Sequence, residues 1–202
     1  MKIYSSENFY TTIINSTHQI SKSTWNNLAD FKNVKDGILV GNPFLSHEFF
    51  TCLEDSGSIS YKTGWVVQHI ILKNIDGLVV GILPNFLKTH SWGEYVFDHI
   101  FADVWQRHGK NYYPKLLSAI PFTPITGPRF LLSKNINQKH AIQVLLSSLK
   151  KLVEDNKLSS SHINFIDHKQ ACHACEDPSW LKRYGIQFHW KNDNYENFEG
   201  FL

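Results

Sequence analysis

The sequence lacks any hydrophobic run long enough to cross a membrane as a helix. Its longest apolar run, residues 77–83, has the length of a strand, whereas a membrane span needs roughly 18 apolar residues. The N-terminus turns polar within its first eight residues, where a signal peptide needs an apolar segment. We therefore expect a cytoplasmic protein without a transmembrane helix.

The sequence also has few cysteines and a small net charge. Three cysteines, Cys52, Cys172 and Cys175, form an odd set that suits reduced thiols better than a disulfide framework. The net charge is only +2, and Lys and Arg gather into no block of the kind that marks a dedicated nucleic-acid binder. Disulfide-stabilised secreted domains and dedicated nucleic-acid-binding domains are therefore disfavoured.

Several common catalytic motifs are absent. The sequence contains no Ser nucleophile elbow, no H-E-x-x-H zinc motif, no kinase motifs and no dinucleotide-binding G-x-G-x-x-G. What it does contain is apolar material: 42% of its 202 residues are hydrophobic and 14% are aromatic, against 19% charged. This composition predicts a globular chain with a packed core, and one domain accommodates its length.

The hydrophobic patterning predicts a mixed α/β fold. The clearest element is a hairpin of residues 61–73 and 78–89, because the Asp76-Gly77 step between them suits the positive φ of a tight turn. Neither strand alternates cleanly between apolar and polar residues, which predicts a central sheet covered by helices on both faces. The order of elements is βααββα, a loop, then αβαβ.

The remaining elements follow from caps and apolar periodicity. We expect one helix capped by Ser21 or Ser23 and a second that begins at Asn42-Pro43 or at Ser46. Further helices are expected at 95–108, 137–157, 178–184 and from 197, with strands at 9–14, 162–166 and 186–190. Residues 112–129 hold four of the seven prolines but little polarity, which predicts a buried, shaped loop.

This loop supplies the first candidate site. Gly127 and Arg129 precede the helix expected from Asn137, so backbone N–H groups, the helix dipole and a guanidinium could together bind a phosphorylated ligand. Tyr112, Tyr113 and Lys115 could line a ligand pocket at the start of the same loop. The alternatives are an ordinary Pro/Gly connector and aromatic residues that only pack.

Two further clusters are open to more than one interpretation. His99 and Asp103 are four residues apart on the predicted helix 95–108, as in an acid–base pair, although surface pairs of this kind are common. His168, Cys172 and Cys175 would share one helical stripe and are residue types that bind zinc, but no fourth ligand is evident. We expect no metal, with reduced cysteines and an exposed histidine as the simpler interpretation.

Several segments taken together resemble the FemAB-like branch of the GNAT acyltransferase superfamily, bacterial proteins of peptidoglycan biosynthesis or recognition. The segments are residues 42–50 and 53–57, Gly64-Trp65, Gln68-His69, 93–98 (Gly-Glu-Tyr-Val-Phe-Asp), 112–115 (Tyr-Tyr-Pro-Lys), 121–124 (Pro-Phe-Thr-Pro), 127–129 (Gly-Pro-Arg) and 187–190 (Gln-Phe-His-Trp). Each is unspecific alone, but their order and spacing make chance agreement improbable.

The resemblance implies a fold and a class of reaction. It implies a GNAT-like mixed β-sheet flanked by helices on both faces, with residues 1–202 forming a single GNAT-like domain that is the N-terminal half of a longer two-half protein. It also implies an acyl-CoA or aminoacyl-tRNA as acyl donor, and a small-molecule or peptide-like acceptor. The usual coenzyme A motif, Arg/Gln-x-x-Gly-x-Gly/Ala, is missing.

These observations lead to one main hypothesis and two alternatives. The chain is expected to be an acyl- or aminoacyltransferase half-domain that moves an activated acyl group onto an amine, with Asp98 as the base. Its ligand-lining residues would be Tyr112, Tyr113, Lys115, Thr123, Gly127 and Arg129. The alternatives are a non-catalytic module that binds a cell-wall precursor or anionic metabolite, and a small zinc-stabilised interaction domain.

Overall fold

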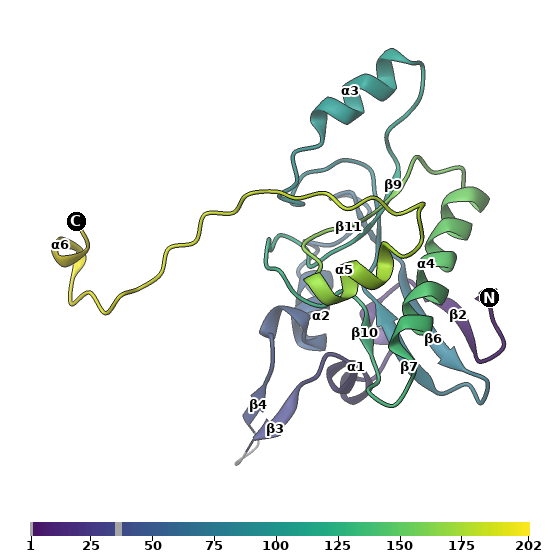
Figure 1. The fold of residues 1–202 in the computed structure, drawn as a ribbon, viewed down its shortest axis with the longest axis horizontal. Helices are drawn as coiled ribbons and strands as arrows, with labels where there is room; N and C mark the ends of the chain where they lie inside the picture. The colour runs from purple at the N-terminus through teal and green to yellow at the C-terminus, as the bar shows by residue number, and fades with distance from the viewer. Residues whose placement is uncertain (1, 35–37) are drawn as a thin grey trace.

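A five-stranded antiparallel sheet forms one half of the framework. The computed structural model describes residues 2–34 and 38–202 (Figure 1). The strands of this sheet run in the order β1-β2-β6-β7-β10, with bounds Lys2–Ser5, Phe9–Ile14, His69–Asn74, Val79–Leu83 and Leu131–Leu132. Strand β2 confirms the strand predicted at 9–14, whereas β1 was not predicted.

A four-stranded mixed sheet forms the other half. Its order is β11-β9-β8-β5, with bounds Ser161–Ile163, Lys115–Ser118, Phe86–Lys88 and Trp65–Val67. Strands β11 and β9 are parallel, and the other two pairs are antiparallel. Strand β9 lies inside the segment predicted as a loop, so that prediction is wrong for its first part.

The predicted hairpin connects the two sheets. Its arms pair as β6 with β7 in the first sheet and as β5 with β8 in the second, and Gly77 in its turn has φ +84°. The arms change sheet at Gln68 and Asn85, where the backbone N–H of Gln68 donates to the Asn85 carbonyl at 2.9 Å. The buried His69 ring accepts from the Asn85 N–H at 3.0 Å and fixes this crossing point.

Helices cover both faces of the first sheet. Ile70 and Leu72 of β6 face the core formed with α4 (Gln138–Asp155), while Ile71 between them faces the core formed with α1 (Lys22–Leu28) and α2 (His47–Asp55). This alternation is the two-residue period of a strand buried on both sides. The predicted mixed α/β class with two covered faces is confirmed, and the arrangement is consistent with a GNAT-like fold.

Short elements complete the chain. They are the hairpin β3 (Lys32–Val34) with β4 (Ile38–Val40), the 3-10 helices Thr17–Gln19 and Pro43–Leu45, α5 (His168–Ala174) and α6 (Phe198–Phe201). None of the helices in the ranges 2–34 and 38–202 combines the length and the hydropathy that crossing a membrane requires.

Helix α3 (His99–Arg107) and the C-terminal segment stand apart from the body. Figure 1 shows α3 projecting at the top and the chain after α5 running outwards to α6. No side chain of α3 is buried. Residues 178–184 and 186–190 form neither the predicted helix nor the predicted strand. Trp180 packs against the core formed with α4, but the other apolar side chains of these segments, such as Phe188 at 97% exposure, are exposed.

Candidate functional site

Two lysines enter the interior from neighbouring strands. Lys88 of β8 and Lys115 of β9 lie directly opposite each other in the sheet, and both side chains are fully buried. A buried ammonium group is strongly destabilising unless it is paired and hydrogen-bonded. The partners of these two lysines therefore define the chemistry of this region.

Lys115 is fully paired. Its Nζ donates to Asp98 Oδ2 at 2.6 Å, to Glu94 Oε2 at 2.9 Å and to Ser91 Oγ at 3.0 Å. Three acceptors satisfy the three N–H donors of an ammonium group. All three belong to residues 89–98, the segment between β8 and α3, which we call the cover segment.

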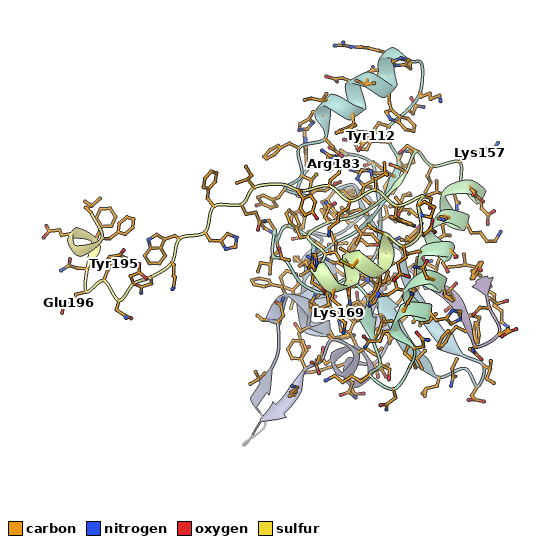
Figure 2. All side chains as sticks on the ribbon, in the orientation of Figure 1. Tyr112, Lys157, Lys169, Arg183, Tyr195 and Glu196 are labelled. Carbon is orange, nitrogen blue, oxygen red and sulfur yellow. The ribbon has the colours of Figure 1, made fainter. Side chains whose placement is uncertain are left out.

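Two tyrosines complete the Lys115 cluster. The Tyr112 hydroxyl donates to Asp98 Oδ2 at 2.8 Å, and the Tyr113 and Ser91 hydroxyls lie 2.8 Å apart. Burial, together with the bond to Asp98, raises the pKa of Tyr112, so its hydroxyl keeps its proton and donates it. Figure 2 marks Tyr112 where α3 joins the body.

The two carboxyl groups of the cluster have opposite pKa shifts. Burial alone raises the pKa of Asp98, but the hydrogen bonds from Lys115, Ser91 and Tyr112 outweigh it and the pKa lies below its usual value. Burial dominates at Glu94, whose pKa is raised despite its contact with Lys115. Glu94 Oε1 and Asp98 Oδ1 are buried and have no hydrogen-bond partner among the described residues.

Lys88 has fewer hydrogen-bond acceptors than Lys115. Among residues 2–34 and 38–202, the acceptor of its Nζ is the Trp92 carbonyl at 3.3 Å, and Nζ lies 3.7 Å from the centre of the Trp65 ring. Burial lowers its pKa to about 7, with Lys115 adding to the lowering and Glu94 opposing it. The two lysines thus sit side by side in different electrostatic surroundings.

Gly93 holds the cover segment against the body. Its carbonyl accepts from the Phe122 N–H at 3.2 Å, and its φ of +78° suits glycine. A Cβ at Gly93 would stand 2.6 Å from the Phe122 ring. Any side chain at this position would therefore have to displace the Phe122 ring for the segment to close over the cluster.

We predict that Gly93→Ala destabilises the protein by clearly more than Gly57→Ala does. Both glycines have positive φ, which costs alanine about 1–2 kcal/mol, but a Cβ at Gly57 meets nothing within 4 Å. Urea unfolding measures the difference, which we expect to exceed about 1 kcal/mol because alanine at Gly93 must displace the Phe122 ring. Equal losses would contradict the close packing of the cover segment.

The far end of the 112–129 loop is tied down by backbone groups. Arg129 is fully buried and donates to the carbonyls of Asn164 at 2.8 Å, Pro128 at 3.1 Å, Gly127 at 3.2 Å and Ile125 at 2.5 Å. Burial lowers its pKa to about 10.

The backbone N–H groups of this turn are also occupied. The Gly127 N–H donates to the Phe165 carbonyl at 3.0 Å, and the Arg129 N–H donates to Gln170 Oε1 at 2.8 Å. These donors would have to leave their present partners before they could bind an anion. An anion-binding role for Gly127 and Arg129 stays a prediction.

The structure thus brings together four of the sequence-predicted site residues. Asp98, Tyr112, Tyr113 and Lys115 form one hydrogen-bonded cluster. Thr123 is partly buried just after Phe122, and Gly127 and Arg129 pair with another segment. Sequence reasoning missed three members: Ser91, Glu94 and Lys88, the last of which was detectable as a cation at the end of an apolar strand.

The structure gives less support for a functional site at the other candidate clusters. His99 and Asp103 are both exposed on α3, and His168 Nε2 lies 3.5 Å from Cys172 Sγ. Within residues 2–34 and 38–202, no group of three His, Cys, Asp or Glu side chains is placed to hold a metal ion.

A cavity of about 440 Å³ lies near the start of α4, lined by Phe9, Ile136, His140 and their neighbours, and none of the predicted site residues reaches it.

Comparison with known families decides the relationship of the chain. Residues 16–202 match the profile of the FemAB-like family, described as peptidoglycan biosynthesis/recognition. The chain belongs to the FemAB-like family. Searches of curated proteins and of solved structures each returned no match. The FemAB-like match spans both sheets apart from β1 and β2, and it includes every residue of the Lys115 cluster.

Proposed function

We propose that this FemAB-like chain takes part in N-acyl transfer, moving an acyl group from an activated ester or thioester onto an amine. The donor would be an aminoacyl-tRNA or an acyl-CoA, and the acceptor a peptidoglycan precursor or a similar peptide-like amine. The observation that carries the proposal is the buried Lys115 ammonium, held by Asp98 and Glu94 within a chain of this family.

A buried cation suits the chemistry of acyl transfer. When an amine attacks the donor's carbonyl carbon, negative charge develops on the carbonyl oxygen, and a fixed positive charge in a low-dielectric site stabilises it. The direct attack needs no covalent enzyme intermediate, which agrees with the missing nucleophile motifs. We assign Lys115 to stabilising this oxygen.

Asp98 takes a positioning role in this proposal. It was predicted as the base, but its lowered pKa and its bonds from Lys115 and Tyr112 make it a poor proton acceptor. A carboxylate in this position orients the ammonium group and balances its charge. Glu94 shares that task through its bond to Lys115.

Substrate access requires the cover segment to move. The cluster is sealed in this structure, and its acceptors Ser91, Glu94 and Asp98 all come from the cover segment. The helix that follows, α3, packs no buried side chain against the body. A partial movement that withdraws Ser91 would free one Lys115 N–H group for the donor's carbonyl oxygen, while Asp98 and Glu94 keep their bonds to Lys115.

Tyr113 and Thr123 are also proposed to line the site. Tyr113 adjoins Ser91 and is positioned to line the opened site. Thr123 lies next to Phe122, which contacts the cover segment at Gly93, and is proposed to line the same site. The second half implied by the family resemblance stays a prediction.

A transfer assay tests the proposal. The chain is incubated with acetyl-CoA or with aminoacyl-tRNA and a muropeptide that carries a free amine, and the product is identified by mass spectrometry. We expect an acylated muropeptide, and no product from the same muropeptide with its amine blocked by prior acetylation. Saturable muropeptide binding without transfer from any donor would instead support the non-catalytic binding module.

A further inference from the structure

The two buried lysines differ in how many acceptors they have. Lys115 has three oxygen acceptors within 3.0 Å, two of them carboxylates, so its ammonium form is stabilised. Lys88 has one neutral carbonyl at 3.3 Å and an aromatic face. The Trp65 face attracts a cation, but one carbonyl and one ring leave a full positive charge on Lys88 incompletely compensated at complete burial, and burial favours the neutral amine.

We propose that Lys88 is held as an uncharged amine and is the proton acceptor of the transfer reaction. This inference rests on the proposed N-acyl transfer and supplies the base that Asp98 does not provide. Its geometric basis is the pairing of the two lysines across β8 and β9, which places Lys88 beside the group assigned to the carbonyl oxygen. Pairs of titratable groups with opposite environments are typical of acid–base sites.

The proton balance of the step is complete. The acceptor nitrogen forms a bond to the carbonyl carbon, and the proton that this nitrogen loses goes to the free electron pair of Lys88 Nζ. The bond from the carbonyl carbon to the donor's oxygen or sulfur breaks, and the leaving group takes the proton from the Lys88 ammonium. Lys88 returns to its neutral form, and no further reactant is needed.

The charged groups around Lys88 favour a titration near neutral pH. Lys115 on β9 and the burial of Nζ lower the pKa of Lys88, and Glu94 on the cover segment raises it, with a result of about 7. The pKa of the neighbouring His90 is lowered mainly by burial and further by the positive charge of Lys88. Lys88 is therefore increasingly neutral as the pH rises through about 7, and transfer should rise with it.

The charge state of Lys88 can be measured without any activity. In protein labelled with ¹³C and ¹⁵N at lysine, NMR titration of the Cε and Nζ signals follows each amine, and Lys88→Arg identifies the signal of interest. We expect one lysine to titrate near neutral pH while exposed lysines titrate near their usual value. A Lys88 signal that titrates with the exposed lysines would overturn the inference, whether or not transfer is observed.

Kinetics test the role itself. With an acceptor whose own nitrogen stays unprotonated over the range, such as a hydrazide, wild-type kcat/KM should fall below about pH 7, following the titration of Lys88. Lys88→Met should lose about 10²-fold or more in kcat/KM and the pH dependence with it. Lys134→Met, an exposed control, should change neither.

The outcomes separate the two proposals. Full activity with an unchanged pH profile in Lys88→Met would overturn the role of Lys88 and leave N-acyl transfer standing. Absence of transfer by the wild-type chain would count against the proposed function, and the NMR titration would still decide the charge state of Lys88. If Lys88→Met fails to fold, Lys88→Arg, which keeps a cation but cannot accept a proton, gives the same test.

Discussion

Replacing Lys115 with methionine is expected to lower the free energy of unfolding by about 3–5 kcal/mol, because one partner of a buried ion-pair cluster is removed. The substitution leaves Asp98 and Glu94 as buried carboxyl groups facing each other without their shared cation. Urea unfolding monitored by fluorescence and circular dichroism measures the change. Together with the loss of Arg129, this is the largest effect on stability that we predict for a single side chain.

Two further variants make the prediction specific. Lys134→Met removes an ion pair with Asp30 in which both side chains are more than half exposed, and it should cost no more than about 1 kcal/mol. Combining Lys115→Met with Asp98→Asn and Glu94→Gln should recover part of the lost stability, since neutral amides tolerate burial better than unpaired charges. A Lys115→Met protein as stable as Lys134→Met would show that the cluster is not closed as described.

Arg129→Met is expected to have an effect of similar size, a loss of about 3–5 kcal/mol in the free energy of unfolding. The guanidinium donates to the carbonyls of Ile125, Gly127, Pro128 and Asn164, and methionine would leave these acceptors without their charged donor. Thermal and urea unfolding measure the loss. The expected consequence is a loosened loop.

Arg183→Met provides the matched control. Its guanidinium is exposed and lies 4.5 Å from the centre of the Phe101 ring, so its loss should cost less than about 1 kcal/mol. An Arg129→Met protein of nearly unchanged stability, with weakened binding of acetyl-CoA, would contradict a structural role and support the anion-binding one.

The sequence was informative where local chemistry decides the structure. The hairpin turn at Asp76-Gly77 and the apolar stripe of α4 are each specified by neighbouring residues and were predicted correctly, and the Ser46 cap of α2 is one of the two helix starts that were predicted. The lack of clean alternation in the hairpin also predicted two covered faces, which the packing of β6 confirms.

Prediction failed where distant contacts decide. The apolar stripe at 178–184 and the alternation at 186–190 predicted a helix and a strand, but apart from Trp180 their apolar side chains are exposed in this structure. The proline-rich appearance of 112–129 concealed β9, whose place in the sheet depends on pairing with β8 and β11. Such pairings are invisible to local periodicity.

The sequence predicted some residues of the candidate site but not how they contact one another. Asp98 and the Tyr112, Tyr113 and Lys115 group were selected separately, and only folding shows that they are hydrogen-bonded to one another. The pairing also bears on the role of Asp98, which stays a prediction: a carboxylate bonded to an ammonium and a phenol has a lowered pKa, and we therefore propose a positioning role for it. No sequence pattern reveals which acid of a cluster is the paired one.

The most direct test of the central claim is the rate of amide formation by Glu94→Gln. This substitution keeps the size of the side chain while removing one of the charges that hold Lys115, and Glu154→Gln on the exposed face of α4 is its control. If the Lys115 cluster is the reaction centre, kcat/KM should fall by about 10²-fold in a folded Glu94→Gln protein and should not fall in Glu154→Gln. Equal rates for the two variants would contradict it.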